Sequence, residues 1–172
     1  SHRPGHLCQG LVALDAGLEH HPAFATIEFD FGDLDTRQLA NQKAPLEIQL
    51  KTEKKQLCYY ELDQGLNHVV RKWSEPIPFN SQTIIPIPGG SDGPGGVFLF
   101  TPGFIYHHRP GGSSSGIPPR ICLPSSHSDA LLTAWAIVKT KSVFFFFLQL
   151  EGGDVFKLKF TSSDFKSFSL KY

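Results

Sequence analysis

The chain has 172 residues, and its 16 basic and 16 acidic side chains give a formal charge of zero. This balance argues against a nucleic-acid-binding domain, which normally carries a basic face, so we expect no direct sequence-specific binding of nucleic acid. The 16 Gly, 13 Pro and 15 Phe predict many short strands separated by turns, and they exclude an architecture of long helices. The absence of methionine suggests a segment excised from a longer protein.

The three cysteines, Cys8, Cys58 and Cys122, are odd in number and far apart. They form no closely spaced pair, so neither a zinc site nor a disulfide framework is indicated. We expect reduced, structural cysteines. The most apolar run, residues 143–148, is far too short to cross a bilayer, and the first ten residues lack the apolar core of a signal peptide. No membrane association is therefore predicted.

The first expected strands lie at residues 11–14 and 23–31. In the second of these, the alternation from Ala25 onward predicts a half-buried strand. Its apolar face holds Ala25, Ile27, Phe29 and Phe31, and its polar face holds Thr26, Glu28 and Asp30. Residues 32–55 break this rhythm with acidic, amide and lysine side chains, which predicts a mobile insertion.

Residues 57–76 have the pattern of a β-hairpin. The strand positions are aromatic or β-branched, as strands prefer: Tyr59, Tyr60, Val69, Val70 and Trp73. Residues 63–67 supply turn-forming Asp, Gly and Asn.

Two further cycles of strands follow. One is expected at residues 83–87, 96–100, 104–108 and 120–123, and the other at residues 131–138, 143–150, 155–160 and 165–172. Three cycles therefore begin near Leu11, Thr83 and Leu131. A four-stranded unit that recurs about every 40–50 residues is typical of a β-propeller blade. Periodicity alone fits a β-sandwich equally well.

Several strings of residues resemble the splicing factor 3b subunit 3 family of large propeller proteins. They are YELD at residues 60–63, GLNHVVRK at 65–72, SEP at 74–76, PGGSDGP at 88–94, KTKS at 139–142 and GDVFK at 153–157. The resemblance runs from about Pro22 to Tyr172. It implies an all-β fold of three consecutive four-stranded blades of a seven-bladed, WD-repeat-like propeller. The blades would span about residues 11–74, 82–123 and 130–172, with the mobile insertion at 32–55 in the first.

The resemblance also implies a function. It points to a nuclear, non-enzymatic scaffold subunit of the splicing factor 3b complex, in the branch-site-binding small nuclear ribonucleoprotein of pre-mRNA splicing. The implied partners are the HEAT-repeat subunit and the small accessory subunits. The chain departs from the family after Pro124, where Ser125, Ser126 and His127 replace an arginine cluster.

Two alternatives stay open. One is a paralogous propeller scaffold, either of a damaged-DNA-binding ubiquitin ligase or of the polyadenylation machinery. The other is an unrelated β-rich enzyme domain.

Three patterns invite a chemical interpretation. The glycine-rich residues 89–96 lack the closing Gly-Lys-Ser/Thr of a phosphate loop, so we expect a tight loop whose glycines adopt positive φ. His127, Ser128 and Asp129 are adjacent, and neighbouring side chains on a strand point apart, which argues against a catalytic triad. The same reasoning argues against metal binding by His20 and His21 or by His107 and His108. The sequence thus indicates no catalytic, cofactor-binding or metal-binding residue, and no small-molecule substrate.

The C-terminal third is rich in lysine. Lys157 and Lys159 alternate with Phe156, Leu158 and Phe160, as on a solvated strand face. An acidic partner or an RNA backbone is the alternative. The basic residues in question are Lys139, Lys141, Lys157, Lys159, Lys166 and Lys171.

Residues 143–150 are apolar on both strand faces, with Phe144 and Phe146 on one and Phe145 and Phe147 on the other. This predicts a strand covered on both sides within a complete propeller. In an isolated three-blade arc, we expect one face to stay uncovered.

Overall fold

The computed structural model describes residues 6–15, 21–30, 54–109, 120–141, 143–161 and 167–172. In these ranges the chain is all-β, with three four-stranded sheets and one short 3-10 turn. The prediction of an all-β chain with three four-stranded units is therefore confirmed. No helix in the described ranges is long and apolar enough to cross a membrane. The chain divides into two compact units, residues 1–13 with 21–79 and residues 14–20 with 80–172.

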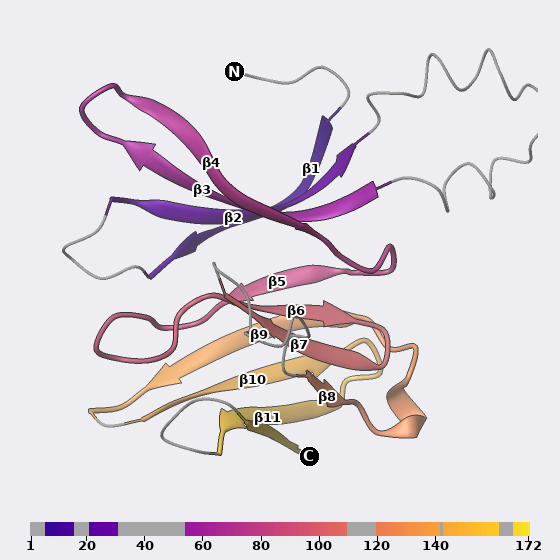
Figure 1. The fold of residues 1–172 in the computed structure, drawn as a ribbon. Helices are drawn as coiled ribbons and strands as arrows, with labels where there is room; N and C mark the ends of the chain where they lie inside the picture. The colour runs from indigo at the N-terminus through magenta and orange to yellow at the C-terminus, as the bar shows by residue number, and fades with distance from the viewer. Residues whose placement is uncertain (1–5, 16–20, 31–53, 110–119, 142, 162–166) are drawn as a thin grey trace, which may run out of the picture. The chain divides into compact units, whose positions relative to one another are not determined.

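The first unit is a single sheet in the order β1-β2-β3-β4 (Figure 1). Its strands are β1 (His6–Leu14), β2 (Ala23–Asp30), β3 (Lys54–Asp63) and β4 (His68–Pro76). The turn between β3 and β4 is held by Asp63, whose Oδ1 accepts hydrogen bonds from the backbone N–H of Gly65 at 2.9 Å and of Leu66 at 3.0 Å. Asn67 completes the turn with a φ of 49°. The predicted hairpin and its turn are thus confirmed.

Strand β2 differs from the prediction of a half-buried strand. Ala25 and Ile27 are buried as expected, but Thr26 and Glu28 on the opposite face are also buried, at 3% and 8% exposure. That part of the prediction is wrong because alternation reports polarity rather than burial. A carboxylate can be buried when charged and hydrogen-bonding partners accompany it, and Glu28 has them.

The predicted mobile insertion falls almost wholly outside the described residues. Of residues 32–55, only Lys54 and Lys55 are described, and they open β3. Phe31, His20, Lys166 and most of the loop after His108 also lie outside the described residues.

The second unit contains two sheets. The first has the order β5-β6-β7-β8 and the second the order β12-β11-β10-β9. The first comprises β5 (Thr83–Pro86), β6 (Val97–Thr101), β7 (Phe104–His108) and β8 (Arg120–Cys122). After the 3-10 turn η1 (Ser125–His127), the second comprises β9 (Leu132–Lys139), β10 (Phe144–Leu150), β11 (Val155–Phe160) and β12 (Phe168–Lys171).

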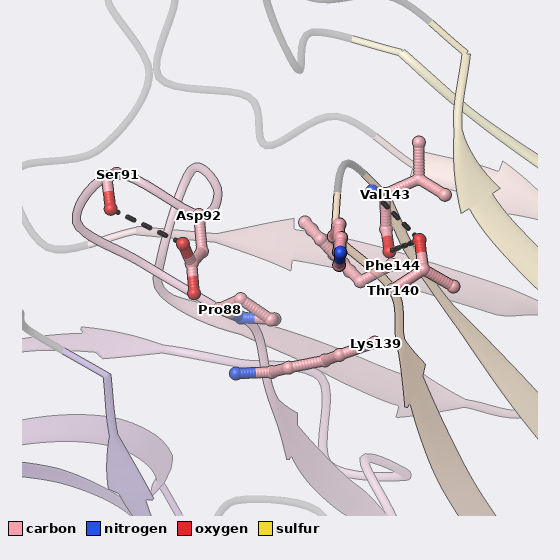
Figure 2. Close-up of a pocket in the computed structure, with 8 residues that line it drawn as sticks. Pro88, Ser91, Asp92, Lys139, Thr140, Val143 and Phe144 are labelled. Atoms are coloured by element: carbon pink, nitrogen blue, oxygen red, sulfur yellow. Dashed lines mark hydrogen bonds between the residues drawn. The ribbon is translucent and has the colours of Figure 1, made fainter.

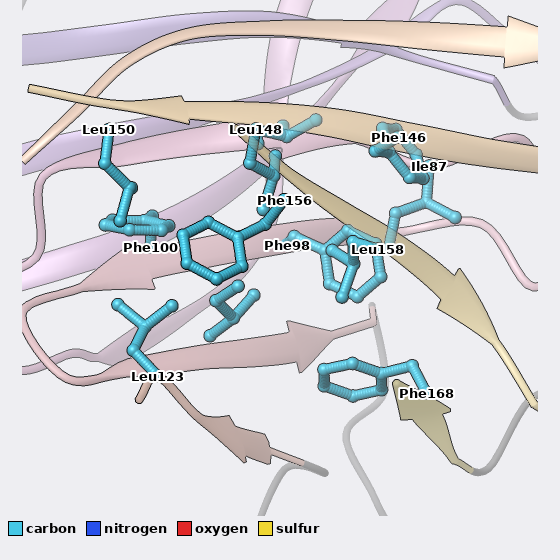
Figure 3. Packing of buried hydrophobic residues seen from close by; sticks show 12 residues of the cluster. Ile87, Phe98, Phe100, Leu123, Phe146, Leu148, Leu150, Phe156, Leu158 and Phe168 are labelled. Atoms are coloured by element: carbon cyan, nitrogen blue, oxygen red, sulfur yellow. The ribbon is translucent and has the colours of Figure 1, made fainter. Parts of the chain in front are cut away.

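These two sheets share one hydrophobic core (Figure 3). Phe98 of β6 lies at its centre, with its ring centroid 5.4 Å from Phe146, 5.5 Å from Phe160 and 5.2 Å from Phe168. All five residues of β6 are buried, so this strand is covered on both faces, as a strand between packed layers requires. The buried residues of the core are Ile85, Ile87, Phe98, Phe100, Ile105, Leu123, Phe146, Leu148, Leu150, Phe156, Leu158 and Phe168.

Strand β10 is buried on one face only in this chain. Phe146 and Leu148 are at most 1% exposed, whereas Phe147 on the other face is 40% exposed. The ammonium of Lys157 lies 3.8 Å from the centroid of the neighbouring Phe145 ring. The outer face of the last sheet is therefore open in this chain, as we expect for an isolated arc of blades. Coverage of both faces in a complete propeller stays a prediction.

Candidate functional site

The glycine-rich loop at residues 88–96 is a tight connection between β5 and β6. Gly90, Gly95 and Gly96 have φ values of 63°, 68° and 81°, which confirms the predicted positive φ. The N–H of Gly95 donates to Pro88 O at 2.8 Å, and the N–H of Asp92 donates to Gly89 O at 3.1 Å. These bonds close the loop on itself.

Strand β7 anchors the same loop from the core side. His107 Nε2 lies 3.1 Å from Gly95 O; because a carbonyl oxygen only accepts, this ring nitrogen carries the hydrogen. Gly96 approaches β7 so closely that a Cβ at this position would lie 2.1 Å from His108 O. The loop is therefore held in one conformation.

This loop and the β9–β10 turn line an open hollow of about 140 Å³, which we call the loop pocket (Figure 2). Its lining residues are Pro88, Ser91, Asp92, Lys139, Thr140, Lys141, Val143 and Phe144. Small-molecule sites usually occupy about 300–1,000 Å³, so the loop pocket has room for one side chain or a small anion rather than for a cofactor.

The walls of the loop pocket are fixed by local contacts. A Cβ on Gly93 would lie 2.5 Å from Pro88 O and 2.8 Å from Phe144 Cε1, so only glycine allows the loop to approach this ring. On the other wall, Thr140 Oγ1 donates to Val143 O at 3.0 Å and accepts from Val143 N at 3.3 Å.

The rim of the loop pocket carries charges of both signs. Lys139 Nζ lies 3.9 Å from Asp15 Oδ2, and these side chains are 51% and 43% exposed. An exposed pair of this kind contributes at most about 1 kcal/mol, so it leaves the ammonium available to a ligand. Lys141 and Asp92 are also exposed, and Asp92 Oδ1 accepts a hydrogen bond from Ser91 Oγ at 3.3 Å.

His127 is paired with a carboxylate that the sequence reasoning did not consider. Its Nε2 lies 2.6 Å from Asp154 Oδ2, and its Nδ1 lies 2.8 Å from Ser126 Oγ. Tyr172 donates to the other oxygen of Asp154 at 2.7 Å. Hydrogen bonds from His127 and then Tyr172 hold the pKa of Asp154 below its usual value.

This arrangement ties together η1, the β10–β11 turn and Tyr172, the residue that follows β12. The imidazole also stands edge-on to Phe156, with centroids 5.2 Å apart. Ser126 and His127 are neighbours in one turn, so a serine nucleophile and its base would have to act from adjacent positions. The geometry favours a structural tie. Only the fold could reveal it, because 27 residues separate His127 from Asp154.

His107 and His108 are both buried, at 3% and 7% exposure. His107 packs against Phe98 and Phe160, with centroid distances of 5.7 and 5.3 Å. Burial lowers the pKa of each imidazole to about 4. Two neutral imidazoles packed among aromatic rings belong to the core rather than to a ligand site.

The described part of the chain gives little evidence of a metal-binding site or of a reactive cysteine. No group of three or more His, Cys, Asp or Glu side chains in these residues is placed to hold a metal ion. All three cysteines are free, and only Cys58 is buried. Burial, and then the charge of Glu28, raise the pKa of the Cys58 thiol to about 12, which makes it a poor nucleophile at neutral pH.

A buried polar cluster crosses the first unit. Arg71 Nη2 of β4 donates to Glu28 Oε2 of β2 at 2.6 Å, and the Tyr60 hydroxyl donates to Glu28 Oε1 at 2.5 Å. Thr26 Oγ1 donates to the same Oε1 at 2.7 Å. Burial alone would raise the pKa of Glu28, but the hydrogen bonds from Tyr60 and Thr26 and the charge of Arg71 hold it below its ordinary value.

Tyr60 and Arg71 are themselves in contact across the β3–β4 hairpin. Arg71 Nη2 and Nε donate to the Tyr60 hydroxyl at 2.9 and 3.1 Å, and Phe24 stacks on the Tyr60 ring with centroids 5.2 Å apart. Both residues belong to the strings YELD and GLNHVVRK. Two residues of these strings thus take part in the polar cluster around Glu28.

Lys55 is a buried cation at the start of β3. It is 4% exposed, its Nζ lies 4.6 Å from the centroid of the Phe29 ring, and it donates to Phe79 O at 3.2 Å. Burial lowers its pKa to about 8. Sequence reasoning assigned this residue to the insertion and so missed it.

The lysines of the last sheet follow the predicted alternation. Phe156 and Leu158 are buried, and Lys159 is exposed. Lys157 is partly covered because its ammonium lies over Phe145. The outer face of this strand thus combines the apolar Val155 with Lys157 and Lys159, and the inner face is apolar.

Comparison with known proteins identifies the family of this chain. A family model described as the RSE1/DDB1/CPSF1 first beta-propeller matches residues 2–172, which confirms the predicted propeller fold.

Curated relatives match most of this chain. The pre-mRNA-splicing factor rse1 of Emericella nidulans is 39% identical over 161 residues, which are 92% of this chain and 13% of the relative. Spliceosome-associated protein 130 A of Arabidopsis thaliana is 38% identical over 160 residues, 92% of this chain and 12% of the relative. Splicing factor 3B subunit 3 of Drosophila melanogaster is 33% identical over 170 residues, 95% and 13% respectively. The chain thus spans about an eighth of these relatives.

Proposed function

Since this chain belongs to the RSE1/DDB1/CPSF1 first-propeller family, we propose that it acts as part of a propeller scaffold in pre-mRNA splicing. Within a longer protein, its three sheets serve as consecutive blades at about residues 11–74, 82–123 and 130–172. The scaffold is non-enzymatic and nuclear. It belongs to the splicing factor 3b complex and contacts the HEAT-repeat subunit and the small accessory subunits.

One observation carries this proposal. Relatives from a fungus, a plant and an insect, which are 33–39% identical over at least 92% of this chain, are all named for splicing or the spliceosome. Identity at this level over nearly the whole length makes a shared fold and a shared role the simplest account.

The polar clusters support a structural rather than a chemical role. Glu28 with Arg71 joins β2 to β4, and His127 with Asp154 joins η1 to the β10–β11 turn. Each of these pairs holds backbone segments together, as a protein that works through its surfaces requires.

A second candidate is a paralogous scaffold. The description of the matching family also names DDB1 and CPSF1, which favours the damaged-DNA-binding ubiquitin ligase and the polyadenylation machinery as alternatives.

Affinity purification of the tagged full-length protein from nuclear extract, followed by mass spectrometry and RNA sequencing, tests the proposal. We expect a HEAT-repeat splicing subunit, small accessory subunits and small nuclear RNA to co-purify. Recovery of a cullin ligase or of polyadenylation factors in their place would reject the splicing assignment and support the paralogue.

A further inference from the structure

We propose that the loop pocket receives an acidic side chain from a peptide segment of a protein partner. This inference rests on the proposed function, because a scaffold acts through such contacts. It adds a site and a ligand chemistry to that function.

The loop pocket is formed before any ligand arrives. One wall is the loop that Gly95 N–H and Asp92 N–H close and that His107 Nε2 ties to the core. The other wall is the turn that Thr140 closes onto Val143. A site with fixed walls binds without the entropic cost of ordering a loop.

The two lysines of the rim determine the charge of the ligand. Lys139 and Lys141 both line the loop pocket, and both are exposed at its rim. The carboxylate of Asp15, 3.9 Å from Lys139 Nζ, is too exposed to hold that ammonium firmly. Either ammonium group is therefore available to pair with an incoming carboxylate.

Other features favour a peptide over a nucleic acid. The loop pocket holds about 140 Å³, which is room for one acidic side chain but not for a base with its sugar. Pro88, Val143 and Phe144 give it an apolar wall, which suits the side chains beside an acidic residue in a peptide. Asp92 and Asp15 stand at the same rim as the two lysines, so the rim suits a single carboxylate beside one ammonium better than the continuous charge of a phosphate backbone.

The test uses the full-length protein and fluorescence anisotropy. The probe is a fluorescein-labelled dodecapeptide that contains a Glu-Glu-Leu-Glu stretch, and a matched peptide carries Gln in place of each Glu. A labelled U-rich single-stranded RNA is the third probe, and inorganic phosphate is a competitor.

The variant K139E/K141E reverses both charges at the loop pocket. The control variant K159E/K171E makes the same change on β11 and β12, at exposed positions outside the loop pocket. We expect K139E/K141E to weaken binding of the acidic peptide about tenfold and K159E/K171E to change it less than about twofold. The Gln peptide should bind about tenfold more weakly than the Glu peptide, and the melting temperature should stay unchanged in both variants.

Three results would overturn the assignment. They are an absence of acidic-peptide binding, an equal loss of binding in both variants, and K139E/K141E-sensitive binding of the RNA without binding of the peptide. The affinity purification from nuclear extract tests the proposed function independently of the loop pocket. Recovery of splicing subunits together with any of these three results would reject the loop pocket and leave the scaffold role standing.

Discussion

The guanidinium of Arg71 lies 2.6 Å from the carboxylate of Glu28, a residue 43 positions earlier in the chain. The two side chains are only 24% and 10% exposed. Their contact spans β3, whose Tyr60 hydroxyl bonds to both. The cluster therefore links three strands of the first sheet through one ion pair and one phenol.

Replacing Arg71 should destabilise the protein much more than replacing its neighbour. Arg71→Met leaves Glu28 buried without its cation, which for a fully buried pair costs about 3–5 kcal/mol. Because Arg71 is a quarter exposed, we expect a loss of about 2–3 kcal/mol in the free energy of unfolding, measured by urea denaturation. Lys72→Met is the matched control, because its exposed pair with Glu61 at 3.6 Å contributes at most about 1 kcal/mol. Equal losses in both variants would contradict a buried ion pair.

Stability should fall as the pH is lowered from about 6.5 towards 4, in part because of His107. The folded imidazole, whose pKa burial lowers to about 4, stays neutral there, while the unfolded one takes up a proton near its ordinary pKa of 6.5. The unfolded state then binds more protons, so the free energy of unfolding decreases by up to about 1.4 kcal/mol per pH unit for this histidine. His107→Gln keeps an N–H donor for Gly95 O but cannot titrate. Its unfolding free energy should depend less steeply on pH in this range, and an unchanged slope would refute the assignment.

Glu75 should make the free energy of unfolding depend on pH in the opposite direction. Burial raises its pKa from an ordinary value of 4.5 to about 7, so the folded state holds the proton more strongly than the unfolded state does. The resulting stabilisation is complete below about pH 4.5 and is lost as the pH rises through 7. Glu75→Gln should therefore raise the melting temperature relative to the wild type at pH 8 and leave it nearly unchanged at pH 4.5. A gain of equal size at both pH values would show that charge is not the cause.

The two faces of β10 should respond differently to alanine. Phe146 is fully buried beside Phe98, so Phe146→Ala should cost about 3–5 kcal/mol in unfolding free energy. Phe147 is 40% exposed, so Phe147→Ala should cost less than about 1 kcal/mol in this chain. Thermal and urea denaturation of the chain would measure both, and similar losses would show that the outer face is also covered.

The isolated 172-residue chain should self-associate through the open face of its last sheet. Phe147 and Val155, at 40% and 45% exposure, lie on this face with Phe145, and an exposed apolar face of this kind promotes association. Phe147→Asp should shift the chain towards monomer in sedimentation velocity. A wild-type chain that is monomeric at all concentrations would exclude self-association through this face.

Local sequence determined the elements of this protein. Each signal used for these elements involves only a few consecutive residues. The signals are the alternation from Ala25, the turn residues Asp63 to Asn67 and the glycines around Asp92. Backbone propensity and turn geometry are local, so strands and tight loops could be predicted with good agreement. The resemblance to propeller proteins then supplied the architecture, which periodicity alone left open between a propeller and a sandwich.

The tertiary structure alone decided which polar residues are buried and which loops meet. Glu28 lies on the polar face of its strand in the sequence, yet it is buried in the structure. It can be buried because Arg71 of β4 supplies a charged hydrogen-bond donor. His127 pairs with Asp154 rather than with its neighbour Asp129, and the loop pocket joins residues near 90 to residues near 140. Such pairings depend on strand order and register over tens of residues. A pattern confined to neighbouring residues carries no information about them.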